Sequence, residues 1–331
     1  MKKSQWLFML ILITSVIINL SANNWISMWM GLELNMMSFI PVILNDKNKL
    51  SSEAAMIYFL IQSLSSLLMM MMLISYMCNY LIYGVFNYYI LVISIMIKLG
   101  AAPFHSWFPK ISTMMNWSKN FILMTWQKIM PLIMISNLNN NSTMIINMTI
   151  IMSIIIGSIG GINQVSLRKL MSYSSINHVG WMLSINKSMN LWMMYLMIYS
   201  IMMMMICYLF NNYKIYFLNQ LNSLNMNSSE KFNMMIMMMS MGGLPPFIGF
   251  LPKWITIQSL INTKDMMMIF IMIMLSLITL MYYMRVMTNM FLMNSTTIKW
   301  SITNINKYIM STMMCCNLSL PMFLILDLFY F

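Results

Sequence analysis

The chain is a succession of long apolar runs separated by short polar stretches. Because about 20 helical residues cross the hydrocarbon core of a bilayer, each run of this length predicts a transmembrane helix. The pattern therefore predicts an all-α polytopic membrane protein of about eleven spans, with no soluble domain. The spans are expected at residues 4–21, 25–44, 54–77, 81–117, 120–138, 143–162, 168–185, 190–212, 232–262, 265–286 and 307–330.

Two of these spans, 81–117 and 232–262, are too long for one straight helix, and they share a pattern. Each contains Gly-x-x-Pro-Phe followed five residues later by Pro-Lys, starting at Gly100 and at Gly243. Proline removes a backbone donor and breaks or kinks a helix, so Pro103 and Pro246 mark two broken membrane helices. Unwound backbone at membrane depth is tolerated only inside protein or beside water, so each break predicts a hydrated interior position.

The two broken spans are the fourth and the ninth, five spans apart. An odd separation means that the two copies cross the membrane in opposite directions, which predicts an inverted repeat. The expected organisation is a first five-helix unit at 1–140, a second and inverted five-helix unit at 141–290, and a connector with the last span at 291–331.

The longest polar connector joins the eighth and ninth spans, from Asn211 to Lys231. Its apolar residues have a loose helical spacing, which is consistent with a segment lying along the membrane interface or with a solvated loop. These residues are Ile215, Leu218, Leu221 and Leu224.

Composition agrees with this class of protein. Of the 331 residues, 60% are hydrophobic and only 7% are charged, and the mean hydropathy is +0.76. The net charge of +12 comes from residues placed mainly between the spans, so it indicates topology rather than nucleic-acid binding. The 52 Met residues stand mostly where Leu or Ile would serve equally well, as expected of a genetic code that reads AUA as Met, which indicates an organelle-encoded protein.

If successive connectors lie on alternate sides of the membrane, nearly all basic residues of the connectors fall on one side. The side opposite the N-terminus has only Lys187 and Lys264, and by the positive-inside rule the N-terminal side is the cytoplasm or the mitochondrial matrix. That side collects Lys2, Lys3, Lys47, Lys49, Lys110, Lys119, Arg168, Lys169, Lys214, Lys231, Arg285, Lys299 and Lys307.

Four charged residues lie inside the apolar spans: Glu33, Lys98, Lys128 and Lys253. A lysine at the centre of a membrane helix costs about 2.5 to 3.5 kcal/mol on insertion scales, so such residues are functional candidates by default. Burial disfavours the charged forms of these side chains and an opposite charge favours them, so a carboxylate moving near a lysine would act as a protonation switch. A structural ion pair is the alternative for Glu33.

Other candidates are less well defined. Lys253 has Lys110 as its counterpart in the repeat, about ten residues beyond the glycine, a depth that suits either a proton half-channel or an interfacial anchor. His105, just after the first break, can extend a proton relay or simply bond a freed carbonyl. The chain has no clustered metal ligands and no nucleotide, flavin or iron-sulfur motif, so we expect no metal and no cofactor in it.

Three motifs together resemble the antiporter-like, proton-translocating subunits of respiratory complex I, over essentially the whole chain. They are Trp-Met-Gly-Leu-Glu-Leu-Asn at 29–35, Lys-Leu-Gly-Ala-Ala-Pro-Phe-His-Ser-Trp at 98–107, and Gly-Gly-Leu-Pro-Pro-Phe at 242–247 followed by Lys253. The wider family has fourteen helices arranged in inverted five-helix repeats, and eleven resembles its shortened animal mitochondrial form.

The resemblance implies that Glu33 and Lys98 form a buried pair, that Lys128 is the central relay, and that Lys253 leads to the exit. It also implies that redox chemistry driven by NADH and ubiquinone lies in other subunits, which would be the partners together with neighbouring antiporter-like chains and the lipid bilayer. The expected location is the mitochondrial inner membrane, with the N-terminus in the matrix. The alternatives are a free-standing cation/proton antiporter of the same ancestry and a scaffold subunit that pumps nothing.

Overall fold

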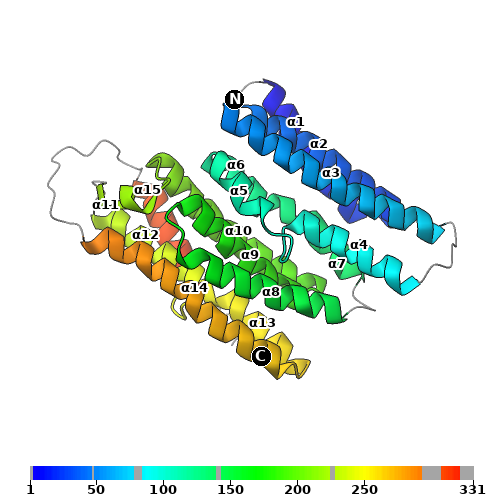
Figure 1. Cartoon of the computed structure of the whole chain (residues 1–331). Coiled ribbons are helices and arrows are strands. Elements are labelled where there is room, and N and C mark those ends of the chain that lie inside the picture. Colours follow the sequence, from blue (N-terminus) through cyan, green and yellow to red (C-terminus); the bar gives the residue numbers. More distant parts are fainter. Residues whose placement is uncertain are drawn as a thin grey trace. The chain divides into compact units, whose positions relative to one another are not determined.

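The computed structural model describes residues 3–46, 48–77, 84–138, 143–223, 228–292 and 307–320. This part of the chain is almost entirely helical, and its only β contact is an isolated bridge between Ser166 and Phe217. The chain forms two compact units (Figure 1). Unit 1 contains Met1–Ser153 and Asn186–Met189, and unit 2 contains Ile154–Ile185 and Asn190–Phe331, so that α8 passes from one to the other.

In unit 1, three long helices lie side by side, with α2 packed between α1 and α3 (Figure 1). Helix α4 packs against α3 and α7, and α7 also contacts α1 and α2. The helices are α1 (Lys3–Ser21), α2 (Trp25–Leu44), α3 (Lys49–Met77), α4 (Gly84–Leu99), α5 (Trp107–Met114), α6 (Trp117–Met124), α7 (Trp126–Leu138) and the first part of α8 (Thr143–Ile162).

Unit 2 is built around α9, most of whose side chains are buried even though many of them are polar. Helix α13 packs against α9 and α14, α14 also contacts α11 and α12, and α15 packs on α12. The helices are α9 (Leu167–Ser184), α10 (Met189–Asn212), α11 (Leu218–Ser223), α12 (Ser228–Gly242), α13 (Phe250–Asn262), α14 (Met266–Leu292) and α15 (Lys307–Asn317).

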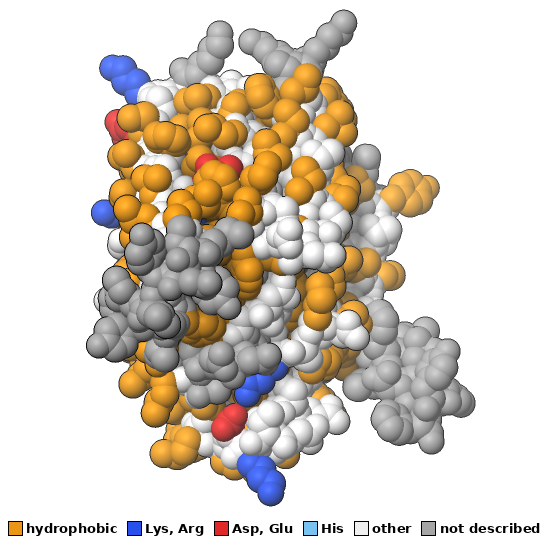
Figure 2. All heavy atoms as spheres, turned by 90° about the vertical axis from the view of Figure 1, so that its right-hand side faces the viewer, with side chains coloured by type: hydrophobic (Ala, Val, Ile, Leu, Met, Phe, Trp, Pro, Cys, Tyr) orange, Lys and Arg blue, Asp and Glu red, His pale blue; other side chains and the backbone are white. Residues whose placement is uncertain are grey.

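Helix α3 shows how these sequences fit a bilayer. Apolar side chains at helical spacing face outward, including Leu64 and Met71, which are 61% and 66% exposed. The opposite stripe carries Tyr58, Gln62 and Ser65, and all three are buried. This is the reverse of a soluble helix, because lipid takes the apolar face and polar groups are satisfied inside the helical bundle. The face of the molecule in Figure 2 is accordingly covered mostly by hydrophobic side chains, with Lys and Arg at only a few points.

The predicted all-α architecture is confirmed, and so are both broken spans. The fourth span divides into α4 and α5, and the ninth divides into α12 and α13. By length and composition, six helices in the described part of the chain can cross a membrane, and shorter apolar helices occupy other predicted spans. The last predicted span is helical as far as Asn317, and residues from 321 onward lie outside the described part.

One break was not predicted, in the span expected at 120–138. Helix α6 ends before Thr125, whose hydroxyl donates a hydrogen bond of 2.7 Å to the carbonyl of Phe121, and α7 begins at Trp126. A threonine that bonds back to its own helix offers the backbone an alternative to the regular ladder.

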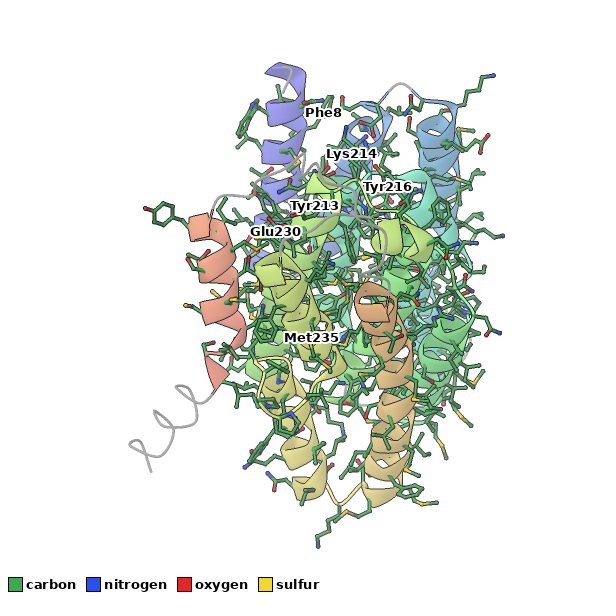
Figure 3. The ribbon with its side chains drawn as sticks, turned by 90° about the vertical axis from the view of Figure 1, so that its left-hand side faces the viewer. Phe8, Tyr213, Lys214, Tyr216, Glu230 and Met235 are labelled. Carbon is green, nitrogen blue, oxygen red and sulfur yellow. The ribbon has the colours of Figure 1, made fainter. Side chains whose placement is uncertain are left out.

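The connector after α10 contains the short helix α11. Ile215, Leu218 and Leu221 are buried, so their apolar side chains are covered by protein rather than by water. Leu224 lies outside the described residues. Figure 3 shows Tyr213, Lys214 and Tyr216 of this connector toward the same end of unit 2 as Glu230, in the first turn of α12.

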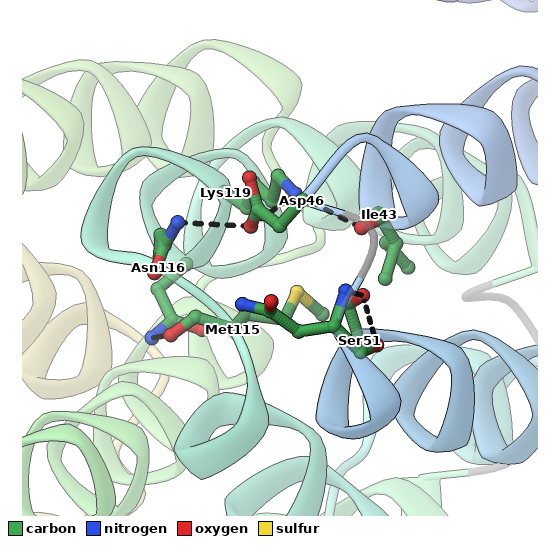
Figure 4. A network of polar contacts seen from close by, with 8 residues as sticks. Ile43, Asp46, Ser51, Met115, Asn116 and Lys119 are labelled. Atoms are coloured by element: carbon green, nitrogen blue, oxygen red, sulfur yellow. Dashed lines mark hydrogen bonds and ion pairs between the residues drawn. The ribbon is translucent and has the colours of Figure 1, made fainter.

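One end of unit 1 is fastened by a polar cluster around Asp46, just after α2 (Figure 4). The ammonium of Lys119 lies 2.5 Å from the Asp46 carboxylate and donates a hydrogen bond of 2.9 Å to the carbonyl of Ile43. The amide of Asn116, between α5 and α6, donates to the same carboxylate at 2.8 Å. The cluster therefore ties the end of α2 to the segment that leads into α6 and α7.

Candidate functional site

The two helix breaks share one backbone geometry. Gly100 and Gly243 both have a left-handed backbone, with φ of +67° and +76°. The N–H of each glycine donates to the carbonyl three residues earlier, at 3.1 Å and 2.9 Å, and the next N–H reaches back five residues, at 3.2 Å and 3.4 Å. This pair of bonds is the Schellman motif, in which a glycine with positive φ ends a helix and satisfies its last carbonyls.

Different side chains cover the two glycines. A Cβ added at Gly100 would lie 3.2 Å from the ring of Trp107 and 3.4 Å from Phe108, both on the following helix α5. A Cβ added at Gly243 would lie 2.8 Å from the Lys253 side chain, on the following helix α13. The first break is therefore packed by aromatic rings and the second by a lysine.

Unit 1 contains a cavity of about 20 Å³ at its first break. This volume is sufficient for at least one water molecule, which needs about 10 to 15 Å³. Both Lys98, in the last turn of α4, and Lys128, in α7, line the cavity, and they are only 7% and 2% exposed. The other lining residues are Leu32, Asn35, Tyr58, Gln62, Leu99, Trp107, Phe108, Leu123, Gln127 and Pro131.

Polar groups from several helices meet at this cavity. The side-chain amides of Asn35 and Gln127 bond each other twice, at 2.9 Å and 3.2 Å. The hydroxyl of Tyr58 donates to the same Gln127 oxygen at 3.1 Å, and the amide of Gln62 donates to the backbone carbonyl of Lys98 at 3.4 Å. Because half of the lining side chains are polar, a water molecule in the cavity would find hydrogen-bond partners.

Aromatic rings form another part of the lining. The ammonium of Lys128 lies 5.5 Å from the centre of the Phe108 ring, a distance at which the face of an aromatic ring attracts a cation. Phe108 is packed edge-on by Trp107, and Trp107 by Tyr58. The helix that follows the first break thereby contacts the helix that carries the second lysine.

Glu33 lies on α2, partly buried, and it forms no ion pair with Lys98 in this structure. Its Oε1 atom is buried and accepts no hydrogen bond. The direct pair implied by the resemblance is therefore absent from the described part of this structure, and the role of Glu33 stays a prediction.

In unit 2, the side chain of Lys253 turns back toward the second break. Its ammonium donates a hydrogen bond of 2.7 Å to the carbonyl of Gly242 and lies 5.8 Å from the centre of the Trp181 ring. Lys253 is only 5% exposed, whereas its repeat counterpart Lys110 is exposed. Lys253 thus lies in the interior of the unit, and its depth in the membrane stays a prediction.

His105 and the two prolines lie in the connecting segments of the breaks. The Nδ1 atom of His105 is 3.2 Å from the carbonyl of Pro103, as in the alternative in which this histidine bonds a freed carbonyl. Both Pro103 and Pro246 are exposed, and neither lines the cavity. In the part of the chain that the structure describes, no three His, Cys, Asp or Glu residues come together. That the chain needs no cofactor or metal stays a prediction.

Sequence reasoning missed several polar groups. Asn35 was noted only as part of a motif, and the sequence did not indicate Tyr58, Gln62 or Gln127 as site residues. The sequence could have indicated Tyr58 and Gln62, because they are polar residues at helical spacing within an apolar helix. In unit 2, the Nδ1 atom of His178 forms a hydrogen bond of 2.8 Å with the hydroxyl of Tyr195, in a buried group of aromatic residues. That group also includes Tyr199, Tyr282 and Tyr283.

Residues 22–279, which include all four candidate charges, match the family described as NADH:quinone oxidoreductase/Mrp antiporter, TM. NADH-ubiquinone oxidoreductase chain 2 of Anopheles gambiae is 43% identical over 92% of this chain and 91% of the mosquito protein. The chain belongs to the NADH-ubiquinone oxidoreductase chain 2 family. The protein of the same name from Aedes aegypti is also 43% identical, over the same shares of both chains.

The fold of this chain 2 family member also has solved counterparts. A chain in the structure of respiratory complex I from Thermus thermophilus with bound aureothin superposes with a TM-score of 0.82. The match covers 95% of this chain and 76% of the bacterial one at 16% identity, so it shows the fold alone. The resemblance inferred from the three motifs is thereby confirmed at the level of family and fold.

Proposed function

We propose that this chain is a membrane-arm subunit of mitochondrial NADH-ubiquinone oxidoreductase and that it moves protons through Glu33, Lys98, Lys128 and Lys253. The observation that carries the proposal is the cavity in unit 1, where two buried lysines line one small polar space. Burial of an ammonium group disfavours its charged form, so both side chains are able to release a proton.

The chain's own residues then perform three tasks. The cavity admits water that can carry a proton between Lys98 and Lys128. An opposite charge near an ammonium group favours its protonated form, so movement or protonation of Glu33 would release a proton from Lys98. In unit 2, the carbonyl of Gly242 accepts a hydrogen bond from Lys253 and stabilises its protonated form.

The proposal places the chain in the inner membrane with its N-terminus in the matrix, as the distribution of basic residues predicts. Redox chemistry is assigned to other subunits, and this chain converts the energy into proton movement. Moving one charge against a potential of 100 mV requires about 2.3 kcal/mol. Neighbouring membrane subunits of the complex, including antiporter-like chains, are the proposed partners.

The test is Lys98→Met in the assembled complex, reconstituted in vesicles. We expect assembly to be retained, while proton pumping and coupled NADH oxidation fall at least about tenfold, because acid-base groups contribute factors of this size or more. Unchanged pumping per NADH would reject the relay. Gentle solubilisation that yields the chain alone, outside any large assembly with NADH dehydrogenase activity, would instead favour a free-standing antiporter.

A further inference from the structure

The amide groups of Asn35 and Gln127 form a closed pair between two helices of unit 1. We propose that this pair, the amide latch, is a positioning device that holds the helix of Lys128 against the helix of Glu33. The inference rests on the proposed function. It adds two residues that do not titrate to a relay defined so far only by charges.

The geometry of the latch is reciprocal. Asn35 donates to the Gln127 oxygen at 2.9 Å, and Gln127 donates to the Asn35 oxygen at 3.2 Å. Asn35 is only 3% exposed. Two parallel bonds between neutral groups fix both the distance and the rotation of the two helices, since either one alone would leave a hinge.

Tyr58 extends the latch to a third helix. Its hydroxyl donates to the Gln127 oxygen at 3.1 Å, so that both acceptor sites of this oxygen are occupied. The Tyr58 ring is itself held edge-on by Phe39 on α2 and by Trp107 on α5. Hydrogen bonds at one amide therefore join α2, α3 and α7, and α5 packs against the ring of Tyr58.

The place of the latch in the chain explains its effect on proton transfer. Asn35 follows Glu33 by two residues on α2, and Gln127 directly precedes Lys128 on α7. Both amides also line the cavity shared by Lys98 and Lys128. A displacement of about 1 Å can cost on the order of a hundredfold in a reaction that depends on geometry, so the register of these helices matters. Amides stay neutral, so they fix position without competing for the proton.

An exchange of the two amides tests the latch. Asn35→Gln lengthens one side by a methylene and Gln127→Asn shortens the other, so each single variant mismatches the pair and the double variant restores its length. In the assembled complex in vesicles, we expect each single change to reduce proton pumping about fivefold and the double variant to recover most of the loss. Recovery by exchange requires direct pairing, because two independent losses would add.

The control is Asn120→Gln. Asn120 is also a buried amide, but it bonds the carbonyl of Ser112 at the end of α5 and does not line the cavity. We expect this variant to pump normally per assembled complex, even where the yield of complex falls. Normal pumping in both single latch variants, or a double variant as impaired as the worse single one, would overturn the proposal.

A milder variant covers the case in which the latch variants fail to assemble. Tyr58→Phe removes one hydrogen bond and leaves the amide pair, so we expect it to assemble and to speed hydrogen exchange in α7. This exchange is independent of pumping, so it separates a failure of the latch from a failure of the relay. Unchanged exchange in α7 would overturn the extension of the latch to Tyr58, whereas normal pumping in Lys128→Met would reject the relay and leave the latch as a structural element.

Discussion

The two helix breaks have the same backbone but hold their lysines on opposite sides of the glycine. At the first break, Lys98 precedes Gly100 by two residues, and aromatic rings from the next helix cover the glycine. At the second break, Met241 takes the place of Lys98, and Lys253 reaches back from the next helix to cover Gly243. The Schellman geometry depends only on the glycine and the backbone, so the ionisable side chain can move without disturbing it.

The comparison also separates two ways of supporting a buried lysine. In unit 1, two lysines share a cavity with neutral amides. In unit 2, one lysine is held by a direct bond to a carbonyl that the broken helix leaves available. A hydrogen bond to the charged form of a lysine favours that form, so a lysine that lines a cavity should release its proton more readily than one bonded to a fixed carbonyl. We therefore expect the two lysines to differ in function although they occupy related breaks.

The largest expected effect distinguishes Lys253 from its repeat counterpart Lys110. Lys253→Met removes the bond to Gly242 and the buried charge, and we expect proton pumping to fall at least about tenfold. Lys110→Met changes an exposed side chain and should leave pumping within about twofold of the parent, as surface changes usually do. Pumping measured per assembled complex checks both. Equal losses of pumping in the two variants would show that the difference in exposure between Lys253 and Lys110 does not determine their function.

The next effect concerns the glycines themselves. Alanine at either position pays about 1 to 2 kcal/mol for a left-handed backbone, which should lower the thermal stability of the complex in both cases. At Gly243 the new Cβ would also lie 2.8 Å from the Lys253 side chain, whereas the closest neighbour at Gly100 is 3.2 Å away. We thus expect Gly243→Ala to reduce pumping beyond its effect on stability. This expectation would be contradicted if pumping fell in the same proportion to thermal stability in Gly100→Ala and in Gly243→Ala.

Much of the architecture was predictable because it depends on local chemistry. The lengths of the apolar runs predicted the membrane helices, and the bounds of α2 coincide with the predicted 25–44. Glycine and proline at fixed offsets gave both breaks, since only these residues readily supply a positive φ or remove a donor. The inverted relation of the two units stays a prediction.

The contacts of the candidate site were less predictable, because they depend on how helices pack. Sequence spacing placed Lys253 well beyond its break, yet its long flexible side chain returns to the break. The pairing of Asn35 with Gln127 joins residues 92 positions apart, which no local pattern indicates. Glu33 was matched with Lys98 by resemblance, but the two side chains form no ion pair in this structure. The residue types indicated which side chains belong to the site, whereas tertiary packing determines which of them are in contact.

A smaller effect is expected from the aromatic support of the first cavity. Phe108→Leu keeps an apolar side chain but removes the ring that lies 5.5 Å from the Lys128 ammonium. A cation–ring contact contributes about 0.5 to 2 kcal/mol, so we expect pumping to fall about twofold to tenfold. Phe108→Tyr keeps an aromatic face and serves as the matched control. The aromatic contact would lose its assigned role if leucine and tyrosine supported pumping equally well.

The smallest effect should come from His105, which decides whether the first break contains an additional titrating group. Its ring nitrogen lies near the Pro103 carbonyl, and the residue does not line the cavity of Lys98 and Lys128. Glutamine can donate a similar hydrogen bond but cannot carry a proton at neutral pH. We therefore expect His105→Gln to pump within about twofold of the parent, because a single exposed hydrogen bond contributes about 1 kcal/mol or less. A loss comparable to that of Lys98→Met would instead make His105 a member of the relay, and the two breaks would then differ by a histidine as well as by the placement of their lysines.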